Sequence, residues 1–157
     1  MLSPDLNEHF LFHGACAETV EEICRGGFDP RRGGNSAGKM FGVATYFAAN
    51  ASKSDLYTEP LTQRLPRQAN RKIIVARVLL GESCRTLQRM PDATRLPDGA
   101  DGKPLDSVWA EVRERSGAVD HLEAMVFDKG QAYPEAVVTY AHVDTCRCAE
   151  CLKRPCT

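Results

Sequence analysis

The sequence predicts an α+β fold in a single domain. Short apolar runs of the kind that form strands outnumber the stretches with helical spacing, and the two kinds do not alternate regularly along the chain. A doubly wound parallel sheet would require such alternation. The 157 residues are 43% apolar and 26% charged, an ordinary composition that suffices for one hydrophobic core.

A strand and a helix are predicted near the N-terminus. Residues 10–12 are apolar and lead directly into His13 and Gly14, so we expect a short buried strand with a polar end. Residues 17–27 have apolar side chains at helical spacing, glutamates in the first half and a glycine pair at the end, which predicts a helix. Residues 29–38 have the composition of a loop, whose arginines and glycines suit either a phosphate contact or an ordinary surface loop.

The stretch over residues 38–57 carries the first candidate site. An apolar run ends at Tyr46, and a polar segment follows in which Asn50 or Ser52 can cap a helix. Tyr46 and Tyr57, with the Ser54 hydroxyl between them, suit a planar aromatic amide, because rings supply stacking area and a hydroxyl fixes orientation. On spacing alone, two tyrosines buried in the core remain the commoner alternative.

The second half contributes further strands and one helix. Residues 72–81 are β-branched and end in a glycine, which is the clearest strand pattern in the chain. Further strands are predicted over residues 122–127 and 136–140. The spacing of four apolar side chains predicts an amphipathic helix over residues 105–115, namely Leu105, Val108, Trp109 and Val112. The remaining segments have loop composition, over residues 58–71, 84–104 and 128–135.

Charge and hydropathy restrict the partners of the chain. The net charge of −1 argues against bulk attraction to nucleic acid or to an anionic membrane. No apolar run approaches the length of a membrane span, and the N-terminus lacks the pattern of a secretion signal. We therefore expect an intracellular protein, cytoplasmic or nuclear, with no membrane partner and no general affinity for nucleic acid.

Seven cysteines are distributed unevenly. Three are scattered, whereas the last dozen residues hold Cys146, Cys148, Cys151 and Cys156. An odd total without an export signal argues for reduced thiols rather than disulfides. The four closely spaced thiols have the donor set of a tetrahedral zinc site, and a reduced tail without metal is the alternative. The sequence thus divides into a domain over residues 1–143 and a cysteine-rich tail over residues 144–157.

Three motifs, in this order, resemble those of the poly(ADP-ribose) polymerase family, the diphtheria-toxin-like branch of the ADP-ribosyltransferases. The first is Leu-Phe-His-Gly-Ala over residues 11–15. The second is Met-Phe-Gly-x-x-x-Tyr-Phe-Ala over residues 40–48, followed by Ser-Lys-Ser-x-x-Tyr over residues 52–57. The third, Glu-x-x-Val-Phe-Asp-x-x-Gln-Ala-Tyr-Pro-Glu over residues 123–135, is most similar to tankyrases. Singly each is weak, because a lone histidine or a glutamate at a strand start is usually structural or solvated.

The resemblance implies a fold and a site. The fold would be two packed, mainly antiparallel β-sheets with short flanking helices around an NAD cleft. His13, Tyr46 and Glu123 would form the catalytic triad of the family. Gly14 and Ser54 would hold the nicotinamide amide between the rings of Tyr46 and Tyr57, and residues 29–38 would lie over the dinucleotide. The implied NAD-binding set is completed by Phe47, Ala48 and Lys53.

The implied activity is transfer of ADP-ribose from NAD to a macromolecular acceptor, a protein or the chain itself, with release of nicotinamide. A carboxylate beside the ribose stabilises the oxocarbenium character that develops when the nicotinamide bond breaks. Zinc at the tail would have no part in this chemistry. A glutamate in the triad permits polymer formation in the family without establishing it. Three alternatives remain: a silent domain that binds NAD or ADP-ribose, transfer to nucleic acid ends, and a zinc-dependent interaction module.

The sequence departs from the family pattern at several alanines. Ala15 stands where a hydroxyl residue is usual, and Ala44 replaces a frequent glycine, which is harmless only where its φ is negative. Ala124 and Ala136 stand where aromatic residues are common. The few residues before the His-Gly motif leave no room for the strand and helix that usually precede it, so either the protein is a minimal version or an N-terminal part is missing from this sequence. There is also no room for a helical regulatory domain, so no dependence on DNA breaks is expected.

Overall fold

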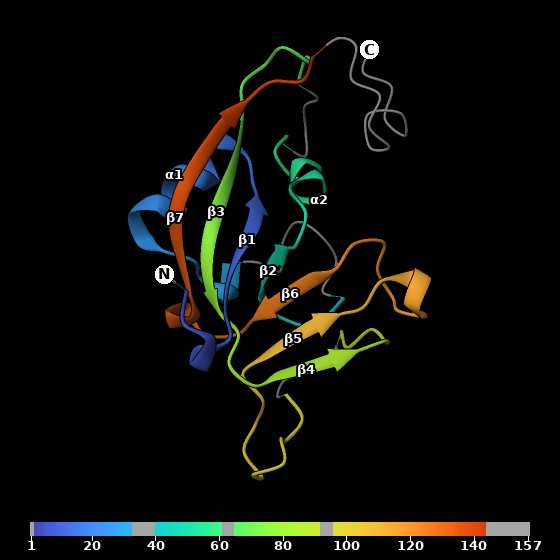
Figure 1. The fold of residues 1–157 in the computed structure, drawn as a ribbon. Coiled ribbons are helices and arrows are strands. Elements are labelled where there is room, and N and C mark those ends of the chain that lie inside the picture. Colours follow the sequence, from blue (N-terminus) through green and yellow to red (C-terminus); the bar gives the residue numbers. More distant parts are fainter. Residues whose placement is uncertain (1, 33–39, 61–64, 92–95, 144–157) are drawn as a thin grey trace.

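A computed structural model describes residues 2–32, 40–60, 65–91 and 96–143 (Figure 1). Within these residues, seven strands form one sheet in the order β4-β5-β6-β2-β1-β3-β7. Neighbouring strands run antiparallel except for β4 and β5, which are parallel. Two α-helices and four short 3-10 turns accompany this sheet in the described part of the chain. The α+β prediction is confirmed.

The strands are β1 (Glu8–Gly14), β2 (Thr45–Ala48), β3 (Arg71–Leu79), β4 (Ser83–Thr86), β5 (Ser107–Ala110), β6 (Glu123–Val126) and β7 (Ala132–Tyr140). The helices are α1 (Ala17–Gly26) and α2 (Ala51–Asp55). The 3-10 turns are η1 (Pro4–Leu6), η2 (Pro30–Arg32), η3 (Arg113–Arg115) and η4 (Lys129–Gln131). No helix in these ranges is long and apolar enough to cross a membrane.

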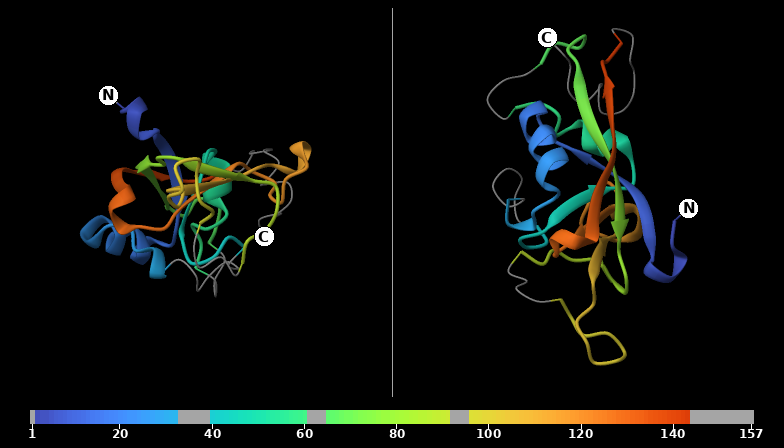
Figure 2. Two further views of the ribbon diagram at one scale, coloured as in Figure 1. Left: turned by 90° about the horizontal axis from the view of Figure 1, so that it is seen from below. Right: turned by 90° about the vertical axis from the view of Figure 1, so that its left-hand side faces the viewer.

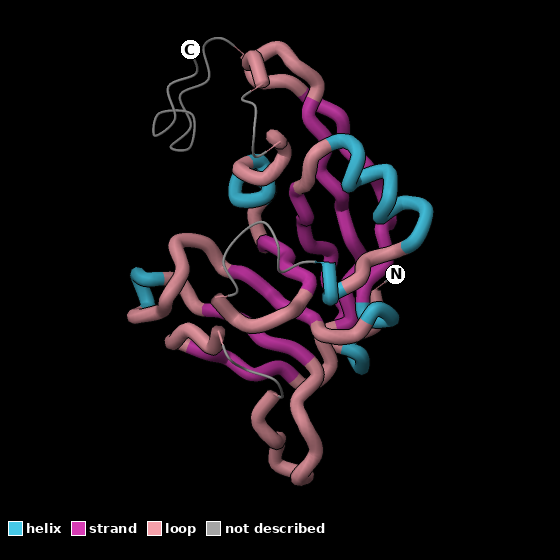
Figure 3. The backbone as a smooth tube through the Cα atoms, turned by 180° about the vertical axis from the view of Figure 1, so that it is seen from behind, coloured by secondary structure: helices cyan, strands magenta, loops and turns pink. Residues whose placement is uncertain are grey.

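The sheet has two halves that meet at β1 and β2. These two strands share a single register pair, Phe12 with Ala48, whereas β1 pairs with β3 from Glu8 to Gly14. Figures 1 and 3 show β1, β3 and β7 side by side with roughly aligned axes. Strands β4, β5 and β6 lie at a steep angle to these axes. The two sheets implied by the resemblance are therefore halves of one continuous sheet, joined by minimal backbone pairing.

The two helices cover opposite faces of the half formed by β1, β3 and β7 (Figure 2). Helix α1 buries Val20 and Ile23 in the main core, as its helical spacing predicts. It ends at Gly26 and is capped by Gly27, whose φ of 75° favours glycine and whose N–H donates to the Ile23 carbonyl. The predicted helix over residues 17–27 is thus confirmed, and α2 follows Asn50 as its polar sequence predicts.

The predicted helix over residues 105–115 is wrong. Residues Ser107–Ala110 form strand β5, which lies between β4 and β6 and is buried throughout. Val108 packs into the second core cluster and Trp109 into the main cluster, because successive side chains of a strand point to opposite faces. A strand buried on both faces has no alternation of polar and apolar residues, so its apolar spacing imitates a helix.

Three loop predictions also need correction. Strand β4 begins one residue before the segment predicted as a loop over residues 84–104 and occupies the first three residues of that segment. Its polar composition suits a strand at the edge of the sheet. The segment over residues 128–135 contains η4 and the start of β7, so the strand predicted over residues 136–140 is longer than expected. The segment over residues 58–71 is a loop in its described part, apart from Arg71, with which β3 begins.

Candidate active site

His13 lies at the junction between the two halves of the sheet. Its Nδ1 is 2.8 Å from the Tyr46 carbonyl oxygen, and its ring packs against Phe28 and Phe47 with centroid distances of 5.3 and 5.7 Å. Because a carbonyl only accepts hydrogen bonds, Nδ1 carries the proton in this contact. Burial lowers the pKa of His13, although the bond to Tyr46 opposes this shift. The neutral ring therefore has an unprotonated Nε2 that can accept a hydrogen bond.

Gly14 and Ser54 lie in direct contact. A Cβ atom at Gly14 would be 1.8 Å from the Ser54 carbonyl oxygen, which is closer than real Cβ atoms approach. Only glycine therefore allows the end of β1 to approach α2 this closely. Ser54 is buried, and the two residues predicted to hold an aromatic amide are brought together.

Tyr46 is held by the loop that precedes it. Its hydroxyl donates to the Gly42 carbonyl at 2.9 Å and accepts from the Phe41 N–H at 3.0 Å. Gly42 has a φ of 83°, which glycine adopts without strain. Ala44 does not have a positive φ and is fully buried, so this departure from the family pattern distorts nothing. Burial raises the pKa of the Tyr46 phenol.

Glu123 and Tyr46 share one face of the sheet. In the β2–β6 ladder, Tyr46 pairs with Met125 and Ala48 pairs with Glu123, so both side chains point to the same side two residues apart. The glutamate lies at the start of β6 and is largely buried. The motifs over residues 40–48 and 123–135 thus meet as the resemblance implies.

Lys53 forms an ion pair with Glu123. The Nζ and Oε1 atoms are 3.2 Å apart, and the two side chains are 17% and 11% exposed. Burial raises the pKa of Glu123, and the Lys53 ammonium opposes this shift. Burial lowers the pKa of Lys53, but the Glu123 carboxylate and the Tyr57 phenol more than offset this, so the net shift is upward. Lys53 also lies 5.4 Å from the centroid of the Tyr57 ring, which is 39% exposed.

Two predicted NAD-binding residues are mainly structural. Phe47 is buried in the main core, with its ring 5.0 Å from that of Phe28, so its side chain supports His13 and does not line a cleft. Ala48 is also buried, opposite Glu123.

The other alanines that depart from the family pattern are accommodated by the fold. Ala15 packs against the main core, and Ala124 pairs with Trp109, whose large ring compensates for the small side chain. Ala136 is exposed on β7.

The candidate phosphate loop and the cysteine tail lie partly or wholly outside the described residues. In the described part of the loop, Arg31 pairs with Asp29 at 2.7 Å and Arg32 with Glu22 at 2.9 Å. The hydrogen bonds from Arg31 lower the pKa of Asp29 to about 2. Among the described residues, no group of histidines, cysteines and carboxylates is arranged to hold a metal ion. The tail cysteines, from Cys146 to Cys156, lie beyond them.

The sequence does not predict the polar residues that hold α2 against the end of β7. Asp55 follows Ser54 and contacts Tyr140 and His142, which come 85 and 87 residues later. A buried arginine, Arg71, holds the loop after α2. No motif links these residues, so no local signal in the sequence indicates that they meet.

This chain is similar to known proteins over most of its length. The family model of the poly(ADP-ribose) polymerase catalytic domain matches residues 3–145. Protein mono-ADP-ribosyltransferase PARP11 of Homo sapiens is 29% identical over 154 residues, which cover 87% of this chain and 42% of that protein. Protein mono-ADP-ribosyltransferase PARP12 of Homo sapiens is 33% identical over 138 residues, which cover 86% of this chain and 17% of that protein. The chain therefore spans less than half the length of these relatives.

Proposed function

The chain belongs to the poly(ADP-ribose) polymerase catalytic-domain family, and from this membership we propose that it transfers ADP-ribose from NAD to a protein acceptor and releases nicotinamide. The observation that carries the proposal is the meeting of the three motifs at one place. Tyr46 and Glu123 share a face of the sheet, and His13 is bonded to the Tyr46 carbonyl beside them. Gly14 and Ser54 adjoin the same region.

Each residue has a role that its geometry supports. The Gly14 backbone and the Ser54 hydroxyl hold the nicotinamide amide, and Tyr46 and Tyr57 stack against its ring. His13 offers an acceptor nitrogen to a ribose hydroxyl, because its other nitrogen is occupied by the Tyr46 carbonyl. These contacts position the bond between nicotinamide and ribose for cleavage.

Glu123 supplies the negative charge that the reaction requires. When the nicotinamide bond breaks, positive charge develops on the ribose, and a fixed carboxylate in a largely buried site stabilises it. The same carboxylate can accept the proton of an incoming hydroxyl, or orient a carboxylate acceptor. The Lys53 ammonium favours the ionised form of this group, because it opposes the upward effect of burial on the pKa of Glu123.

A protein acceptor is favoured over nucleic acid ends by two observations. The relatives are named as protein mono-ADP-ribosyltransferases, and the net charge of −1 offers no general attraction for nucleic acid. The acceptor includes the chain itself under our proposal. The number of ADP-ribose units transferred is an outcome of the experiment below.

Two further expectations from the sequence stand as proposals. For Cys146, Cys148, Cys151 and Cys156 the sequence leaves two proposals, one tetrahedral zinc site away from the active site and a reduced tail without metal, and metal analysis of protein purified without chelator would distinguish them. An intracellular location, cytoplasmic or nuclear, fits the three described cysteines, Cys16, Cys24 and Cys84, which are free thiols.

The proposed function is tested by incubating the chain with NAD labelled on the adenylate phosphate. We expect free nicotinamide and labelled protein, and the mobility of that protein on a denaturing gel distinguishes single units from chains. Glu123→Gln should retain NAD affinity but transfer ADP-ribose slower by a factor on the order of a hundred, because one developing charge loses its partner. NAD binding by the unaltered chain without release of nicotinamide would instead indicate a silent binding domain.

A further inference from the structure

Helix α2 carries Ser54 and is followed by Tyr57, two of the residues proposed to hold nicotinamide, but the helix has little stability of its own. It is five residues long, and its N-cap residue Asn50 makes no side-chain capping bond. A helix this short does not persist in water without tertiary contacts. Its inner side has two such contacts: the Ser54 backbone against Gly14, and Lys53 against Glu123.

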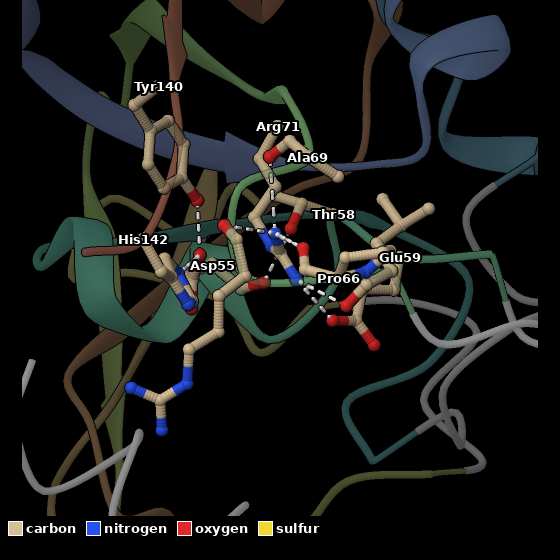
Figure 4. A network of polar contacts seen from close by, with 10 residues as sticks. Asp55, Thr58, Glu59, Pro66, Ala69, Arg71, Tyr140 and His142 are labelled. Carbon is tan, nitrogen blue, oxygen red and sulfur yellow. Dashed lines mark hydrogen bonds and ion pairs between the residues drawn. The ribbon is translucent and has the colours of Figure 1, made fainter. Parts of the chain in front are cut away.

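Asp55 holds the side of α2 that faces the end of β7 (Figure 4). The Asp55 carboxylate accepts a hydrogen bond from the Tyr140 hydroxyl, and its Oδ1 lies 2.8 Å from His142 Nε2. A carboxylate at the C-terminal end of a helix is unfavourable beside the negative end of the helix dipole. The two donors compensate for this position. They also tie α2 to the last residue of β7 and to the segment that follows it.

A second set of contacts fixes the chain that leaves α2. The Thr58 hydroxyl donates to the Asp55 carbonyl at 2.8 Å. The buried Arg71 guanidinium donates to the Pro66 carbonyl at 3.0 Å and pairs with Glu59 at 2.6 Å. Arg71 and Tyr140 form a register pair of β3 and β7. Neighbouring residues of β3 and β7 therefore contact both the loop after α2 and the Asp55 side of α2.

We propose that Asp55, Tyr140 and His142 form a positioning cluster that holds α2 against the end of β1 and so presents Ser54 and Tyr57 to nicotinamide. None of the three is a catalytic residue, since they act through the helix. Their effect on the reaction depends on the proposed function, whereas their effect on the helix does not. Ser54 and Tyr57 hold nicotinamide before and during bond cleavage, so a displaced helix weakens NAD binding more than it slows the chemistry.

The kinetic test compares Tyr140→Phe, Asp55→Ala and Asp55→Asn. We expect Tyr140→Phe to raise KM for NAD roughly tenfold, because it loses one hydrogen bond to a partly buried carboxylate, and Asp55→Ala to raise KM at least as much, because it removes that carboxylate and both of its contacts. In both variants kcat should stay within about threefold of the original value. Asn keeps an oxygen that accepts from both donors, so Asp55→Asn should recover most of the affinity lost in Asp55→Ala. Tyr133→Phe is the matched control, because Tyr133 lies on the same strand but is 64% exposed.

Hydrogen exchange of the amides around α2 provides a readout that needs no activity. The Leu56 and Tyr57 amides donate to the Lys53 and Ser54 carbonyls, and they should exchange faster in Tyr140→Phe and Asp55→Ala than in Tyr133→Phe. Unchanged exchange and unchanged KM would overturn the proposal. So would a lower kcat and melting temperature with KM unaltered, which indicates a general loss of stability. If the unaltered chain neither binds nor cleaves NAD, the proposed function fails, and the exchange rates alone decide whether the cluster holds α2.

Discussion

At the scale of single residues, the ion pair between Lys53 and Glu123 sets the charge of the candidate site. The carboxylate is largely buried, and burial raises its pKa despite the ammonium 3.2 Å away. Our proposal needs Glu123 in its ionised form. The rate of transfer should therefore fall as the pH decreases through this raised pKa, at a higher pH than for an exposed glutamate.

Lys53→Met should move this acid limb further upward. Removing the ammonium takes away the largest effect that opposes burial, so the pKa of Glu123 rises and a higher pH is needed to ionise it. The measurement is the pH dependence of kcat/KM for nicotinamide release, because this ratio reports the pKa of Glu123 in the chain without bound NAD. Lys103→Met is the control, because that side chain is 82% exposed and pairs with Asp101 in a surface loop. An acid limb in Lys53→Met that coincides with the control would contradict the role given to Lys53.

At the scale of secondary structure, the sequence predicts the elements whose signals are local. Helix α1 has its apolar spacing, its acidic first half and its terminal Gly27 within a dozen residues, and it forms where predicted. Strand β5 has no such local signal. Its identity depends on β4 and β6 on either side, and on Val108 and Trp109 packing into different core clusters. Short apolar segments are ambiguous until their neighbours are known.

The candidate site divides in the same way. His13, Tyr46, Ser54 and Glu123 are recognisable because they stand in motifs, and the register of β2 with β6 places two of them together. Asp55 stands beside Ser54 in the chain, yet its partners lie in and after β7. Nothing near Asp55 in the sequence indicates a hydrogen-bonding role, so only the fold identifies it.

The contact between β1 and α2 gives a direct test at this scale. Gly14→Ala should lower the free energy of unfolding by about 1–3 kcal/mol and weaken NAD binding, because the added Cβ would meet the Ser54 backbone, which cannot give way without moving α2. Urea denaturation and titration with NAD measure the two effects. Gly26→Ala is the matched control at the end of α1, where a Cβ meets nothing within 4 Å. A Gly14→Ala variant as stable and as tight-binding as Gly26→Ala would refute the close approach.

At the scale of the whole molecule, side chains rather than backbone hydrogen bonds join the two halves of the sheet. The halves share one register pair between β1 and β2. The main core cluster, however, includes Leu11 and Ile74 from one half and Phe47 and Trp109 from the other. This shared cluster lies directly behind His13, so the same contacts that unite the halves also support the candidate site. We therefore expect the halves to unfold together rather than in sequence.

Phe47→Leu tests this cohesion. The Phe47 ring is buried against Phe28, so the smaller side chain should lower the free energy of unfolding by about 1–3 kcal/mol. Trp109 is the one tryptophan of the chain and its fluorescence reports on β5, while amide exchange along β3 reports on the other half. Both probes should shift to lower urea by the same amount. Leu6→Ala is the control, since Leu6 is 52% exposed and its loss should change stability by no more than about 0.5 kcal/mol. A shift of the Trp109 transition without a matching shift in β3 would mean that the two halves unfold separately, and that the junction at His13 can be lost while the half with β3 remains folded.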